Sequence, residues 1–174
     1  YDSSCKGTWL LMKEGYAQVQ WNPANKGNTY ATSAIHTYLN DTFYNLLDEA
    51  VKEVVKQVKI PYASGGTSNN TNTIYTGSNG LSTRIFLPSY SEVGLTGNTT
   101  TEGSMLSYFS SGKGDAANTK RIAYSNGTAI FWHTRSPSTY TPYSHGGIHK
   151  TGGPSTFTTS DEWCYARPAM IMPS

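Results

Sequence analysis

Residues 33–58 read SAIHTYLNDTFYNLLDEAVKEVVKQV, and this segment has the clearest helical period in the chain. Its apolar residues recur at spacings of three and four, which is the pattern of one face of an amphipathic helix. Ser33 is a suitable N-cap, because its side-chain oxygen can accept a hydrogen bond from the first turn. Three polar residues at 40–42 interrupt the pattern. We therefore predict two helices, at about 34–40 and 42–57, that pack on a sheet.

Short runs with the composition of strands flank these helices on both sides. The dipeptide Asn126-Gly127 separates two of them and is the strongest hairpin signal of the chain. Residues 136–160 show no hydrophobic period, so we predict a long irregular loop there, before a terminal strand. This order fits an α+β fold with short, mostly antiparallel strands, as one domain over residues 1–174. The predicted strands are 8–13, 16–21, 58–62, 81–90, 121–124, 129–132 and 163–172.

Smaller features complete the expected organisation. Residues 64–72 read SGGTSNNTN and are predicted to form a polar loop. Residues 105–109 indicate a short helix, and 112–117 are interpreted as a loop, because their glycine spacing does not follow a strand as a dinucleotide site requires. Cys5 and Cys164 are too few for a disulfide scaffold.

Charge is scarce in this sequence. Only 14% of the 174 residues are Asp, Glu, Lys or Arg, while 13 are tyrosine and 17 are glycine. The net charge of +2 gives no basic footprint for nucleic acid. No apolar run approaches the roughly 20 residues that span a bilayer, so we predict no membrane insertion. The chain begins at Tyr1 without a signal peptide, and we expect it to be a piece of a longer or processed protein.

Catalytic signatures are weak. The chain has no Gly-x-Ser-x-Gly elbow. Ser144 and His145 are adjacent, which does not bring the hydroxyl to an imidazole nitrogen. His145 and His149 are four residues apart and would share a face only on a helix, which the glycines between them disfavour. A metal site that adds His133 or Asp161 is weak for the same reason. We predict that the protein is not an enzyme and needs no metal or cofactor.

Two arginines stand out in so uncharged a chain. Arg135 and Arg167 each lie next to a short proline-containing sequence. We expect them to hydrogen-bond to backbone carbonyls or to pair with a scarce carboxylate such as Glu92. Binding of an anionic ligand is the alternative.

Five phrases, in this order, resemble those of an uncharacterised bacterial and phage domain family. That family is similar in turn to the C-type-lectin-like group, which includes sulfatase-modifying-factor-like domains and the variable proteins of diversity-generating retroelements. The triplets that bind calcium and sugar in true C-type lectins do not occur in this chain. The formylglycine-forming enzymes use a cysteine pair near the C-terminus, where this chain has only Cys164. The phrases are SAIHTYLNDTFYNLL (33–47), RIFLPSYSEVG (84–94), RIAY (121–124), WHTRSP (132–137) and YARPAMIM (165–172).

The resemblance implies a C-type-lectin-like architecture. The first and last strands would pair, helices would flank a small sheet, and a long loop near the C-terminus would present the binding surface. In that pairing Cys5 would lie opposite the region of Met172, whereas Cys164 would lie nearer Glu14. This register argues against a disulfide between them.

We expect a non-enzymatic recognition or display domain of a surface or virion protein, extracellular and on a virion or a bacterial cell surface. Its partner would be a cell-surface glycan or protein that meets residues 132–163, because tyrosine among small polar residues is typical of binding loops. The alternative is a decoration or assembly module of a phage particle or surface fibre, with this loop in subunit contacts. Homo-oligomerisation and attachment to a larger chain both stay open. The predicted ligand-binding residues are His133, Tyr140, Tyr143, Ser144, His145, His149, Phe157, Asp161 and Trp163.

Overall fold

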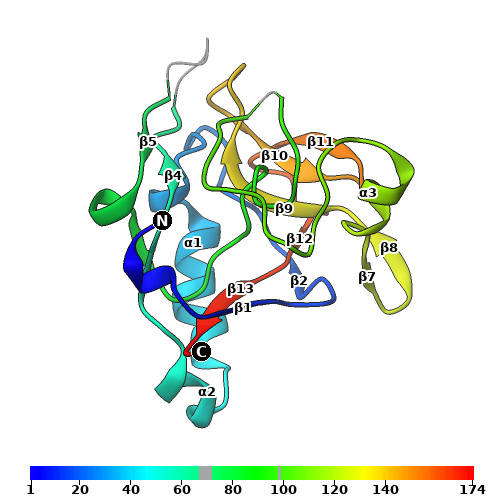
Figure 1. Ribbon diagram of the computed structural model, residues 1–174. Helices are drawn as coiled ribbons and strands as arrows, with labels where there is room; N and C mark the ends of the chain where they lie inside the picture. The colour runs from blue at the N-terminus through cyan, green and yellow to red at the C-terminus, as the bar shows by residue number, and fades with distance from the viewer. Residues whose placement is uncertain (67–71, 98) are drawn as a thin grey trace.

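The computed structural model describes residues 1–66, 72–97 and 99–174 (Figure 1). Many short strands in small sheets and a few short helices make up its regular structure, so the fold is mixed α+β and mostly β. This agrees with the predicted α+β class. Most of the polar loop predicted at 64–72 lies outside the described residues.

The largest sheet has five strands in the order β11-β10-β9-β12-β2. Its strands are β2 (Ala17–Gln18), β9 (Trp132–Pro137), β10 (Ser144–Ile148), β11 (Pro154–Thr158) and β12 (Tyr165–Ala166). All neighbours are antiparallel except β9 and β12, which run parallel.

The irregular loop predicted at 136–160 is wrong, because β10 and β11 lie within it. Two glycines explain why no hydrophobic alternation marks these strands. A Cβ atom on Gly147 would lie 2.0 Å from the Phe157 ring, and one on Gly146 would lie 2.6 Å from Thr99. Neighbouring side chains therefore pack directly on the glycine backbone, which is a known reason for glycine within a strand.

The two ends of the chain pair with each other. β1 (Thr8–Leu11) and β13 (Ala169–Met172) are antiparallel, with Thr8 opposite Met172, and Figure 1 shows them side by side in blue and red. This confirms the predicted pairing of the first and last strands. Cys5 and Cys164 are both buried, and both are free, which agrees with the register argument against a disulfide between them.

The first helix extends beyond the predicted 34–40, whereas the second is shorter than the predicted 42–57. Helix α1 (Ala34–Tyr38) begins at Ser33, whose Oγ accepts from the His36 amide at 3.2 Å. It continues as a π-helical segment over Leu39–Phe43 and then ends in a turn.

Helix α2 covers only Glu49–Val54, so the helix predicted at 42–57 is wrong in extent. Asp48 starts a new helix there, because its Oδ1 accepts from the Ala50 amide at 2.9 Å. Leu46 is 69% exposed and Val54 is 44% exposed, so parts of the apolar period face no core.

The polar residues at 40–42, which interrupt the apolar pattern, include Asn40, and its side chain links two segments of the fold. Asn40 donates to the Ile85 carbonyl at 2.8 Å and accepts from the Ile85 and Arg84 amides. It thereby attaches the π-helical segment to the chain that follows β6 (Leu81–Thr83), which itself pairs with β3 (Val58–Ile60).

The predicted hairpin is confirmed. β7 (Ala123–Ser125) and β8 (Thr128–Ile130) pair across Asn126 and Gly127, whose φ angles of 48° and 78° are those of a type I′ turn. β4 (Tyr62–Ala63) and β5 (Ile74–Tyr75) form a second small pair.

Two short predictions are wrong. Residues 105–109 contain no helix and form a turn only at 107–108, and Met105 and Tyr108 are exposed rather than on one buried face. Helix α3 (Asp115–Thr119) occupies part of the segment expected to be a loop.

A fully buried ion pair lies at the centre of the fold. The Arg135 guanidinium donates to both carboxylate oxygens of Glu92, at 2.6 and 2.7 Å, and both side chains are completely inaccessible. The same guanidinium donates to the carbonyls of Pro61 and Leu87 at 2.9 Å. The expectation that Arg135 pairs with Glu92 is confirmed.

Glu92→Gln is expected to destabilise the domain by about 3–5 kcal/mol, because it leaves a buried guanidinium without its counter-charge. Urea unfolding of the variant and the wild type measures this difference. Glu49→Gln is the matched control, because the Glu49 side chain that pairs with Lys52 at 2.8 Å is 83% exposed, and it should cost at most about 0.5 kcal/mol. Equal costs for the two variants would contradict this prediction.

Candidate functional site

The predicted binding residues fall into three places. Two histidines are buried inside the sheet, a group of aromatic residues lies at its surface, and two tyrosines lie in the connection between β9 and β10. They do not form one continuous loop surface.

His133 and His145 form a buried pair. His133 Nδ1 lies 2.7 Å from His145 Nε2, and His133 Nε2 lies 2.8 Å from the Val19 carbonyl. A carbonyl can only accept, so we assign the His133 proton to Nε2, and His145 then donates to His133 Nδ1. The His145 ring stacks on Trp21, with centroids 5.1 Å apart.

Burial favours the neutral form of both histidines of this pair. Burial lowers the pKa of His133 to about 4 and holds the pKa of His145 well below its usual value, with the neighbouring His133 adding to the effect. The side chains are inaccessible, so a ligand cannot reach them in this structure. Ser144 is buried as well. These three predicted binding residues are part of the buried interior of the protein.

A surface cluster of four rings is formed by one residue of β11 and by residues near the ends of β9, β10 and β12. Trp163 contacts Phe131 and Phe157 edge-to-face, with centroids 5.0 and 5.1 Å away. His149 contacts Phe131 in the same manner at 4.6 Å. Trp163 stays 44% exposed, whereas Phe157 is buried. We call Phe131, His149, Phe157 and Trp163 the aromatic cluster.

Polar groups hold the chain around the aromatic cluster. The Gln18 side chain donates to the Trp163 carbonyl at 3.1 Å. Gln20 donates to the carboxylate of Glu162 at 3.1 Å, and Asp161 accepts from the Thr158 amide at 3.0 Å. Hydrogen bonds to residues 18–20 and to Thr158 therefore hold the segment that carries Trp163 in place.

Tyr140 and Tyr143 are exposed, at 69% and 47%, in the connection between β9 and β10. Asn28, which is completely buried, holds this connection through its side-chain amide. The amide donates to the carbonyls of Thr141 at 3.0 Å and Ser144 at 2.7 Å. The two rings therefore project from an anchored turn.

Sequence reasoning missed Phe131, which touches three rings of the aromatic cluster. The alternation of side chains along a strand is the signal that could have placed Phe131 at the surface. Trp132 is buried, so its neighbour in an extended chain points to the opposite face. Phe131 was counted within a strand and not as a surface residue.

The site offers rings and neutral hydrogen-bonding groups. Among residues 1–66, 72–97 and 99–174, no three His, Cys, Asp or Glu side chains gather closely enough to hold a metal ion. The same residues contain no helix that is long and apolar enough to cross a membrane. Burial raises the pKa of the Cys164 thiol, which opposes formation of a thiolate.

These features define a mixed α+β, mostly β domain that exposes a supported aromatic cluster. The chain belongs to the DUF6273 family, described as a domain of unknown function, whose family model matches residues 6–174. The expected membership of an uncharacterised domain family is confirmed at this level. Comparison with curated proteins and with solved structures gives no match.

The histidine pair predicts acid sensitivity. A depressed pKa in the folded state means that the unfolded chain binds the proton first as the pH falls below about 6.5. The stability that His133 contributes is complete above that pH and is lost between about 6.5 and about 4. We expect urea unfolding to show a loss of roughly 1.4 kcal/mol per pH unit for each such histidine.

Histidine NMR is the decisive measurement, because burial raises the pKa of Glu102 and this opposes the loss of stability. The ring signals of His133 and His145 should keep their neutral shifts down to about pH 5. His149→Gln serves for assignment, since it removes a partly buried ring outside the pair and leaves the pair intact. Titration of either buried ring near pH 6.5 would contradict the prediction.

Proposed function

We propose that this domain is a non-enzymatic recognition module whose contact surface is centred on the aromatic cluster. The observation that carries the proposal is Trp163, a residue that is 44% exposed while two other rings support its ring edge-to-face. A large ring that is fixed before binding loses little conformational entropy when a partner arrives. Asp161 and Glu162 provide hydrogen-bond acceptors beside it.

The proposed partner is a cell-surface glycan or protein, met outside the cell, on a virion or a bacterial surface. Aromatic faces stack on the C–H surfaces of sugars, while hydroxyl and amide groups match sugar hydroxyls. The low charge of the chain supports short-range contacts of this kind over electrostatic steering. Binding should therefore depend only weakly on salt.

A C-type-lectin-like architecture is the finer part of the proposal. The antiparallel pairing of β1 with β13 supports it, as does the early helix α1. Relation to the variable proteins of diversity-generating retroelements is open to a direct test, because adenines should cluster in the codons of exposed tyrosines such as Tyr140 and Tyr143.

Trp163→Ala is expected to weaken binding to a glycan or host-cell protein ligand by about tenfold or more, because it removes the exposed ring. A glycan array followed by titration of the best glycan measures the effect. Tyr124→Ala is the matched control, since Tyr124 is 46% exposed on the β7–β8 hairpin and outside the cluster. Equal effects of the two variants would overturn the role of Trp163.

Tyr140 and Tyr143 test how far the surface extends. Alanine at both positions should weaken binding and leave the unfolding transition unchanged, because both rings are exposed. Unchanged binding would limit the surface to the aromatic cluster. A stable trimer that protects Trp163 and Tyr140 from solvent would instead favour the assembly module of a particle or fibre.

A further inference from the structure

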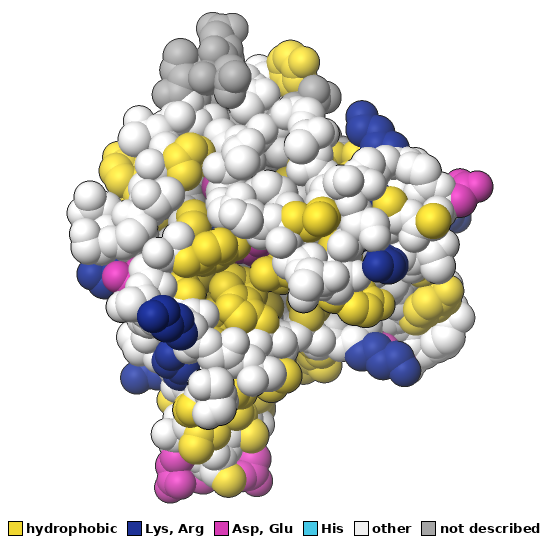
Figure 2. Space-filling view, in the orientation of Figure 1, with side chains coloured by type: hydrophobic (Ala, Val, Ile, Leu, Met, Phe, Trp, Pro, Cys, Tyr) yellow, Lys and Arg dark blue, Asp and Glu magenta, His cyan; other side chains and the backbone are white. Residues whose placement is uncertain are grey.

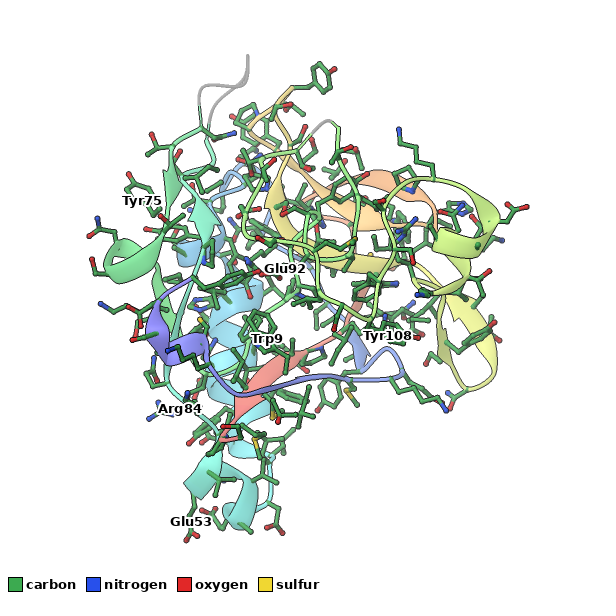
Figure 3. The ribbon with its side chains drawn as sticks, viewed as in Figure 1. Trp9, Glu53, Tyr75, Arg84, Glu92 and Tyr108 are labelled. Carbon is green, nitrogen blue, oxygen red and sulfur yellow. The ribbon has the colours of Figure 1, made fainter. Side chains whose placement is uncertain are left out.

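A concave site, separate from the aromatic cluster, lies beside β1 and β13. It is a cavity of about 720 Å³, within the range of small-ligand sites. Figure 3 labels Trp9 and Tyr108 at this place, and Figure 2 shows hydrophobic side chains gathered there. Its lining includes Trp9, Leu11, Phe86, Leu106, Tyr108 and Arg167.

Arg167 is the buried charge of this cavity. The residue is only 6% exposed. Its Nε donates to the Met12 carbonyl at 2.8 Å, and its guanidinium lies 4.8 Å above the Trp132 ring. Its Nη1 is buried and has no hydrogen-bond partner. The ion pairs among the described residues are Lys52–Glu49 and Arg135–Glu92, so no carboxylate pairs with Arg167.

The surroundings of Arg167 favour an anion. Burial lowers its pKa to about 10, with the Tyr108 hydroxyl acting in the opposite direction. Lys13 adds a second positive charge to the lining, and no aspartate or glutamate contributes to it. A buried cation without a counter-charge is costly, and an anion that enters the cavity would reduce that cost.

We propose that this cavity binds a ligand with a carboxylate group and an apolar body. The carboxylate pairs with the guanidinium of Arg167, which suits planar anions. The apolar body lies between Trp9 and Leu106. The site is separate from the aromatic cluster, so the proposal stands or falls independently of the proposed function. A small acid and the C-terminal carboxylate of a peptide share this chemistry.

The test uses two probes of similar size and shape, 4-phenylbutyrate, which is an anion, and 4-phenylbutyramide, which is neutral. The indole N–H of Trp9 reports binding by NMR, because it donates to the Cys5 carbonyl at 3.1 Å and has a fixed environment. The acid should shift this signal and bind at least about tenfold more tightly than the amide. No shift with either probe, or equal affinity for both, would overturn the proposal.

Two variants locate the binding. Arg167→Gln should abolish the preference for the acid, whereas Lys120→Gln, which removes an exposed lysine outside the lining, should retain it. Should Arg167→Gln fail to fold, Ser107→Trp decides the matter. Ser107 is exposed and lines the cavity, so a tryptophan there should block both probes. Undiminished binding by a folded Ser107→Trp protein would overturn the proposal.

A further pair of probes distinguishes the two sources of carboxylate. A short peptide that ends in phenylalanine is compared with its C-terminally amidated form. Tighter binding of the free-acid peptide than of phenylbutyrate identifies a chain terminus as the occupant class, and the reverse order identifies a small acid. Either order supports the cavity as a carboxylate site, provided that Ser107→Trp removes the binding.

Discussion

The guanidinium of Arg135 joins parts of the chain that are far apart in sequence. Its five N–H groups are all used, on Glu92 and on the carbonyls of Pro61, Leu87 and Glu102. The desolvation cost of a buried ion pair is offset only when the remaining donors also have hydrogen-bond partners. Here one side chain on β9 fixes the segments that carry β4 and the connection between β6 and α3. The central sheet therefore has a single position relative to the rest of the fold.

Local signals predicted the parts of the fold that short-range chemistry controls. Ser33 begins a helix because its hydroxyl replaces a missing partner for a backbone amide. Asn126 and Gly127 form a hairpin because both tolerate positive φ. The Arg135–Glu92 pair was foreseeable for a different reason, since a chain with so few charges leaves a buried arginine few possible partners.

Long-range packing explains what the sequence did not reveal. Strands β10 and β11 carry Gly147 and Phe157, and the ring packs on the glycine backbone, so no alternating pattern appears. The pairing of β10 with β11 also separates the predicted binding residues into buried and exposed ones. His145 lies within this strand pair and is buried, while Trp163 comes after it and remains exposed. Residue composition identified the right region for aromatic exposure, but only the pairing of strands decides which rings face solvent.

Three buried arginines within one chain allow an internal comparison. Arg121 uses its guanidinium fully, on four backbone carbonyls and Asn118, and Arg135 does so on Glu92 and carbonyls. Arg167 makes one such bond and leaves Nη1 without a partner. Two of the three buried guanidinium groups are therefore fully hydrogen-bonded within the fold, and only that of Arg167 is not. The exception faces a cavity lined by apolar side chains, which is where an external carboxylate would complete it.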